Sequence, residues 1–120
     1  MKPLQLYAFG RIAFGVASLA APAVTGATLA GPGGALPDAQ AFLRGMGARE
    51  VGLGIGLLAA IRSHGPVRRW VIAILLGDVG DIAGIAAAWR HMPPAKRRLG
   101  LGTAGAAAAA GAGVLASLPR

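Results

Sequence analysis

The chain has 120 residues, of which 55% are hydrophobic and only 13% charged, yet its formal net charge is +8. Soluble domains carry about 25% charged residues, so this chain has too few charges to cover a surface exposed to water. The hydrophobicity excludes a disordered chain, and the absence of cysteine excludes disulfides and thiolate chemistry. The length fits a single domain, residues 1–120, and the composition predicts that this domain lies in a membrane.

Four apolar stretches follow one another along the chain, at residues 4–21, 45–61, 67–89 and 99–118. Each is close to the roughly 17–25 residues with which a helix crosses a bilayer. They predict an all-α fold, an integral membrane four-helix bundle with short loops. Glycine and proline interrupt residues 22–41, which we expect to form a loop, and Asp38 is expected to cap a helix that begins near Ala39.

Two tryptophans mark the ends of the third stretch. Nineteen helical steps separate Trp70 from Trp89, a distance of about 28 Å. The hydrocarbon core of a bilayer is about 30 Å thick, and tryptophan prefers its two interfaces. We therefore expect this helix to cross the bilayer with one tryptophan at each surface.

Glycines four residues apart occur in two of the stretches, Gly52 with Gly56 and Gly80 with Gly84. In membranes, such pairs let two helices approach closely because they leave room for the neighbouring backbone. Both pairs are predicted to lie at helix crossings.

The first stretch also has the outline of a secretory signal peptide, because Lys2 precedes it and small residues follow Pro22. Arg11 argues against cleavage, since the apolar region of a signal peptide normally contains no charge. We expect residues 4–21 to remain in the protein as its first transmembrane helix.

The positive excess lies in the loops and tails. Lysine and arginine close to a membrane attract anionic lipid head groups. We expect such contacts at five residues, Arg68, Arg69, Lys96, Arg97 and Arg98. Nucleic acid is not an expected partner, because the basic residues fall in four short segments with no aromatic residues between them to stack on bases. The positive charges of the loops are nearly balanced between the two sides of the membrane, which leaves the membrane orientation open. Whether the chain forms a homo-oligomer is also open. The expected location is the cytoplasmic membrane, with several passes.

The charges inside the stretches are the candidate functional residues: Arg11, Arg49, Glu50, Asp78 and Asp81. A charged aspartate at mid-bilayer costs about 2.5–3.5 kcal/mol, so such groups are paired or functional. Together with Arg44, at the rim of the second stretch, these charges sum to zero. We interpret them as an intramembrane polar cluster, which either fixes the helix register or forms a proton relay or a binding site.

Depth in the helices predicts the pairing within this cluster. Asp78 and Asp81 are three residues apart and share a helix face. In an up-and-down bundle, Arg11 lies at the depth of Asp78, and Arg49 lies at the depth of Asp81. Glu50 is rotated about 100° from Arg49 on the helix, so we expect it to face a different partner, in a neighbouring protomer or a cavity.

Three short motifs resemble the DoxX-like group of small four-helix bacterial membrane proteins. They are Arg11-x-x-x-Gly15 with Pro22, Arg44 through Glu50, and Gly77-Asp78-x-x-Asp81. The resemblance covers about Leu6 to Trp89. It implies a four-helix bundle in the cytoplasmic membrane, classed as a domain of unknown function, with no established activity or site residues to carry over.

These features favour an accessory or structural membrane component without enzymatic activity, and the catalytic residues, if any, are unknown. Two alternatives stay open, a proton-coupled transporter of small molecules and a membrane enzyme acting on a lipid-soluble, quinone-like substrate. A sealed ionic cluster favours the accessory or structural component. A cavity open to water favours the transporter, and a cavity open to lipid favours the membrane enzyme. No cofactor is expected, because Gly100, Gly102 and Gly105 match a dinucleotide pattern without its preceding strand. Only two histidines are present, so no metal site is expected either.

Overall fold

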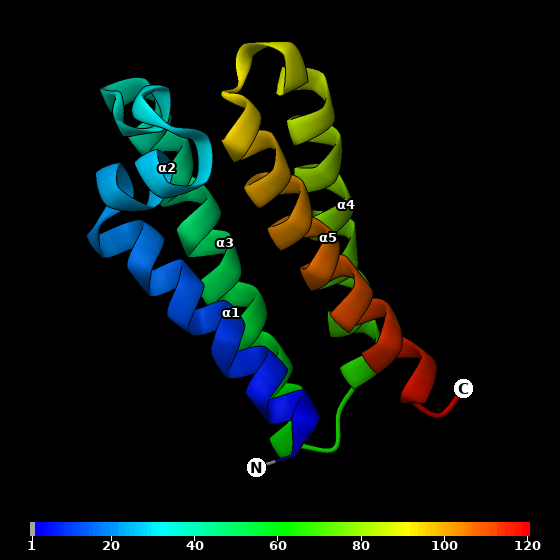
Figure 1. Cartoon of the computed structure of the whole chain (residues 1–120). Coiled ribbons are helices and arrows are strands. Elements are labelled where there is room, and N and C mark those ends of the chain that lie inside the picture. The colour runs from blue at the N-terminus through cyan, green and yellow to red at the C-terminus, as the bar shows by residue number, and fades with distance from the viewer. Residues whose placement is uncertain (1) are drawn as a thin grey trace.

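The computed structural model describes residues 2–120, which form helices and no strand (Figure 1). Within these residues the fold is all-α, as predicted. The α-helices are α1 (Pro3–Ala20), α2 (Pro22–Ala30), α3 (Pro37–Arg62), α4 (Val67–Ala88) and α5 (Pro94–Ser117), and two short 3-10 helices are η1 (Pro32–Ala35) and η2 (Trp89–His91).

Proline starts most of the helices. Pro3, Pro22, Pro37 and Pro94 each occupy the first position of an α-helix. Proline is tolerated there because the first backbone N–H groups of a helix have no acceptor within it, and its fixed φ suits helical geometry. The prolines that interrupt the apolar pattern of the sequence therefore also begin the next helix.

Two antiparallel helix pairs make up the molecule. α1 packs along α3, and α4 packs along α5, while α3 also contacts α4 (Figure 1). α2 turns away from α1 by 109° and lies against both α3 and the start of α5. One contact there is a hydrogen bond of 2.9 Å from Lys96 Nζ to the carbonyl oxygen of Thr28.

The distribution of side chains is the reverse of that in a water-soluble protein. A small apolar core contains Ala8, Leu57 and Ile74, whereas Phe42 is 82% exposed and Leu76 is 70% exposed. Large exposed apolar side chains occur on all five α-helices, while Arg11, Glu50 and Asp78 are buried. Soluble proteins rarely expose so much apolar surface or bury so many charges.

Among the residues that the structure describes, two helical segments are long and apolar enough to cross a membrane, Val67–His91 and Pro94–Ser117. α1 meets the same condition only together with α2, across the 109° bend. α3 has sufficient length, but charged residues interrupt its apolar run, among them Arg44, Arg49 and Glu50.

Several predicted helix boundaries were wrong, while those of 4–21 and 67–89 agree with α1 and α4 to within a residue. The second long helix begins at Pro37 rather than at residue 45, and the last begins at Pro94 rather than at residue 99. Their first turns are polar or basic and so lie outside the apolar runs. The expected loop at 22–41 contains α2 and η1. Asp38 lies in the first turn of α3 and makes no capping hydrogen bond; Leu36 occupies the N-cap position.

The close approach of α1 and α3 depends on glycines that the sequence pattern did not identify. A Cβ atom on Gly15 would lie 2.6 Å from the carbonyl oxygen of Gly47, and one on Gly54 would lie 2.9 Å from that of Ala8. Gly47 and Gly54 are seven residues apart and share one face of α3. Glycine is therefore needed at this crossing because only hydrogen fits between the two backbones.

The predicted glycine pairs behave differently. Gly56 packs against the ring of Trp70, so this glycine does lie at a helix contact. Gly52, Gly80 and Gly84 have no neighbouring atom within 4 Å of a Cβ position. The prediction of close crossings there was wrong, because glycine on an apolar helix marks a crossing only where another backbone comes near.

Candidate functional site

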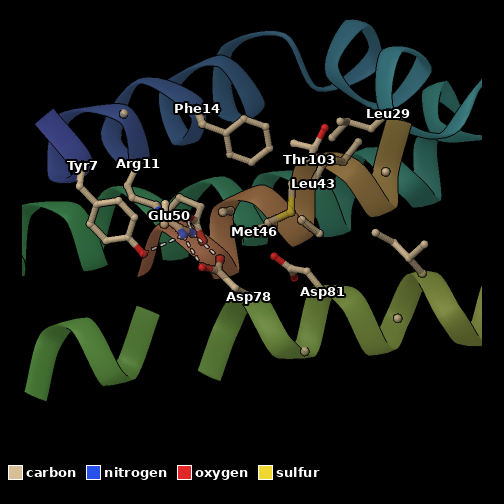
Figure 2. Close-up of a pocket in the computed structure, with 18 of the residues that line it drawn as sticks. Tyr7, Arg11, Phe14, Leu29, Leu43, Met46, Glu50, Asp78, Asp81 and Thr103 are labelled. Atoms are coloured by element: carbon tan, nitrogen blue, oxygen red, sulfur yellow. Dashed lines mark hydrogen bonds and ion pairs between the residues drawn. The ribbon is translucent and has the colours of Figure 1, made fainter. Parts of the chain in front are cut away.

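Five charged side chains from three helices meet in one cluster, which we call the ionic ring. Arg11 comes from α1, Arg49 and Glu50 from α3, and Asp78 and Asp81 from α4. These are the five residues singled out in the sequence, and four of them appear in Figure 2. Figure 2 shows Arg11 reaching from α1 toward Glu50 and Asp78.

Arg11 is the central cation of the ring. Its Nη1 donates hydrogen bonds to Asp78 Oδ1 at 2.5 Å and to Glu50 Oε2 at 2.9 Å, and its Nη2 donates to Asp78 Oδ2. The planar guanidinium thus binds the Asp78 carboxylate in a bidentate ion pair with two parallel hydrogen bonds, the strongest geometry for such a pair. The predicted pairing of Arg11 with Asp78 is confirmed.

Arg49 forms the second half of the ring. Its Nη2 donates to Asp81 Oδ2 at 2.8 Å, which confirms the predicted pairing. Nη2 and Nε also donate to Glu50 Oε1, at 3.1 and 3.2 Å. Glu50 thus pairs with Arg49 as well, although it was expected to face a different partner, because the long arginine side chain spans the angle between adjacent residues. Glu50 does line the cavity described below, the other expected environment.

Charges alternate along the ring. Four ion pairs join its members in the order Asp78, Arg11, Glu50, Arg49, Asp81. The first and last residues, Asp78 and Asp81, are one turn apart on α4 and are not paired with each other. Every buried side-chain nitrogen or oxygen in residues 2–120 has a hydrogen-bond partner. Because every buried polar atom of the ring is paired, the cost of burying its charges stays low, whereas an unpaired buried atom would be strongly destabilising.

The ring has two arginines but three carboxylates. Arg44, which was counted with these charges in the sequence, is exposed and forms no ion pair with the described residues. Arg44 therefore does not balance the charge of the ring, because it lies at the protein surface, away from the acids. With all five groups ionised, the ring carries a net charge of −1.

Tyr7 belongs to the site, although the sequence interpretation did not include it. Its hydroxyl accepts a hydrogen bond of 3.1 Å from Arg11 Nη2, and its ring lies 5.1 Å from Arg11 Cζ. The signal that could have identified it is the spacing of four residues, which places Tyr7 and Arg11 side by side on a helix. Tyr7 also reaches α5, where its hydroxyl is 2.7 Å from the position of a Cβ atom on Gly111.

A cavity of about 920 Å³ lies beside the ionic ring, between α1 and α5, and residues of all five α-helices line it. Phe14, Met46, Gly84 and Ala107 contribute to its largely apolar wall. The polar part of the lining includes Arg11, Glu50, Asp78 and Asp81. Leu29 and Ala30 also line it, so the bend after α1 places α2 against the cavity (Figure 2).

Three carboxylates and one guanidinium in an apolar cavity can bind hydrogen-bond donors and cations. Within residues 2–120, no group of three or more His, Cys, Asp or Glu side chains is placed to hold a metal ion. The cavity offers charge and hydrogen-bonding groups beside a largely apolar wall.

The basic residues expected at lipid head groups differ in their surroundings. Arg68, Arg69 and Arg98 are exposed. Arg97 donates a hydrogen bond of 3.0 Å from Nε to the carbonyl oxygen of Met92, and its guanidinium lies 5.6 Å from the Trp89 ring. Arg97 and Lys96 thus connect α5 to neighbouring segments, and lipid binding by all five stays a prediction.

Comparison of the chain with protein-family models, curated proteins and solved structures finds no match. The resemblance to the DoxX-like group stays a prediction.

Proposed function

We propose that the chain is an integral membrane protein whose four long helices, α1, α3, α4 and α5, cross the cytoplasmic membrane as a DoxX-like bundle. The exposed apolar side chains on all of these helices support this proposal, since lipid would cover them. Arg68 and Arg69 begin α4, and Lys96 to Arg98 follow its other end, as expected for basic groups at two membrane surfaces. α3 crosses with its charges paired in the ionic ring.

Single-cysteine labelling tests these four crossings, because the chain has no cysteine of its own. In sealed vesicles, Ser63→Cys and Ser117→Cys are expected to react with an impermeant maleimide from one side of the membrane. Gly33→Cys and Ala95→Cys are expected to react with it from the opposite side. All four positions are exposed. If Gly33→Cys reacts from the same side as Ser63→Cys, α3 does not cross and the four-helix proposal is wrong.

Within this bundle, the protein binds a lipid-soluble small molecule in the cavity between α1 and α5. One observation carries this function: four members of the ionic ring line a large apolar cavity, and one of them, Asp81, has a side chain that is 34% exposed. A purely structural network needs no cavity, and an apolar space with a few convergent polar groups is the usual form of a small-molecule site. Since α1 and α5 would face lipid, a ligand would enter from the bilayer.

Filling the cavity tests this function. Gly84 lines the cavity and has no atom within 4 Å of a Cβ position, so a side chain can begin there without a clash and Gly84→Leu adds bulk to the cavity wall. We expect this variant to abolish site-specific labelling of α5 by a photoreactive dodecanol in lipid nanodiscs. In the native chain, the expected labelling sites are Ala104 and Ala107, which line the cavity.

The matched control is Gly102→Leu, at a helical glycine that also has open space around it but lies outside the cavity lining. This variant is expected to keep the labelling of Ala104 and Ala107. Equal labelling of cavity positions in the native protein and in Gly84→Leu would contradict the proposal, because the probe would then report only contact with lipid.

A further inference from the structure

The ionic ring lacks one cation. Its five members alternate in charge from Asp78 round to Asp81, so a third positive group between these two aspartates would complete the alternation. No third arginine or lysine among residues 2–120 forms an ion pair with the ring. An uncompensated negative charge is costly in an apolar environment, so this position favours a cation supplied from outside the chain.

Asp81 is the carboxylate with free binding capacity. Both oxygens of Asp78 accept hydrogen bonds from Arg11, and the two oxygens of Glu50 accept from Arg11 and Arg49. Asp81 accepts a bond from the described residues through Oδ2 alone, and its side chain is 34% exposed. It lines the cavity, and Figure 2 shows it extending from α4 toward the side on which Met46 and Thr103 lie.

The rest of the lining defines what kind of cation fits. Hydrated inorganic ions are disfavoured by walls made of side chains such as Phe14, Met46 and Ala107. An anion is disfavoured, because the lining has three carboxylates against the single guanidinium of Arg11. The complementary molecule has an apolar body and one positive charge.

We propose that the cavity binds an organic monocation, an amphiphilic ammonium compound whose apolar body fills the space between α1 and α5 and whose charge is held by Asp81. This inference rests on the proposed cavity function and names its ligand class. The ammonium group donates to the free oxygen of Asp81 and supplies the missing positive charge of the ring. Phe14 and the alanine-rich face of α5 surround the apolar part.

The experiment measures equilibrium binding of three ligands with the same chain, dodecylamine, dodecanol and dodecanoate, to the full protein in phosphatidylcholine nanodiscs at neutral pH. Binding to empty nanodiscs is subtracted. A hydrogen bond to a charged group is strong enough that we expect dodecylammonium to bind at least about tenfold more tightly than dodecanol. Dodecanoate is expected to bind more weakly than either.

Asp81→Asn is expected to remove the preference for dodecylammonium over dodecanol. Asp38→Asn makes the same chemical change at an exposed residue outside the cavity and is expected to keep the preference. Unfolding in mixed micelles reports whether Asp81→Asn folds, which we expect because Arg49 remains paired with Glu50. Asp81→Glu keeps a carboxylate at this position, so it is expected to keep the preference for dodecylammonium over dodecanol that Asp81→Asn loses.

The outcomes separate the two proposals. Equal binding of dodecylammonium and dodecanol would overturn the monocation and leave the cavity function standing, since both ligands would then bind through their apolar chains. A preference that survives in folded Asp81→Asn would overturn the role of Asp81. Absence of saturable binding by all three ligands would contradict the cavity function itself.

Discussion

Replacement of Arg11 by leucine is expected to lower the free energy of unfolding by about 3–5 kcal/mol, the range for removing one partner of a buried ion pair. Arg11 is 9% exposed and is the only described cation that contacts Asp78. Its loss leaves the Asp78 carboxylate buried without a donor from the ring and removes one of the two arginines bound to Glu50. The measurement is unfolding by SDS in mixed micelles, followed by circular dichroism.

Two further variants identify the cause of this loss. Arg11→Leu combined with Asp78→Leu is expected to be more stable than Arg11→Leu alone, because it removes the unpaired carboxylate together with its former partner. Arg98→Leu, at an exposed arginine, is expected to change stability by no more than about 0.5 kcal/mol. A double variant no more stable than Arg11→Leu would show that lost packing, and not buried charge, sets the cost.

The pairings Arg11–Asp78 and Arg49–Asp81 could be predicted because helical geometry determines them once an up-and-down bundle is assumed. Residues three apart share a helix face, and position along an apolar stretch gives depth. These rules place each arginine level with one aspartate once the order of the helices is assumed. The ion pairs at 2.5 and 2.8 Å have this arrangement.

Other features of the site depend on information that periodicity does not contain. The position of Glu50 between two arginines depends on side-chain rotamers, and the exclusion of Arg44 depends on where α3 meets its neighbours. α2 was missed because glycine and proline surround it, and these residues normally signal a loop. The cavity follows from this helix and from the separation of α1 and α5, which no local pattern specifies.

Leucine at Gly15 is expected to destabilise the protein by about 3 kcal/mol or more, the upper end of the cost of overpacking. A Cβ atom at this position would lie 2.6 Å from the carbonyl oxygen of Gly47 and 2.7 Å from Val51 Cγ2. The Gly47 oxygen and the Val51 nitrogen, 2.9 Å from the same Cβ position, belong to the α3 backbone and cannot move aside as a flexible side chain can, so α1 and α3 would have to separate. Because Arg11 and Glu50 lie on these same two helices, the separation is also expected to lengthen the Arg11–Glu50 pair, now 2.9 Å.

Gly10→Leu provides the matched control within α1, because no atom lies within 4 Å of its Cβ position. Leucine has a higher helix propensity than glycine, so this variant is expected to keep or raise the free energy of unfolding, by up to about 1 kcal/mol. The opposite signs at two glycines of one helix would separate backbone contact from propensity. A similar loss at both positions would contradict the close crossing of α1 and α3, and with it the frame that holds Arg11 against Asp78.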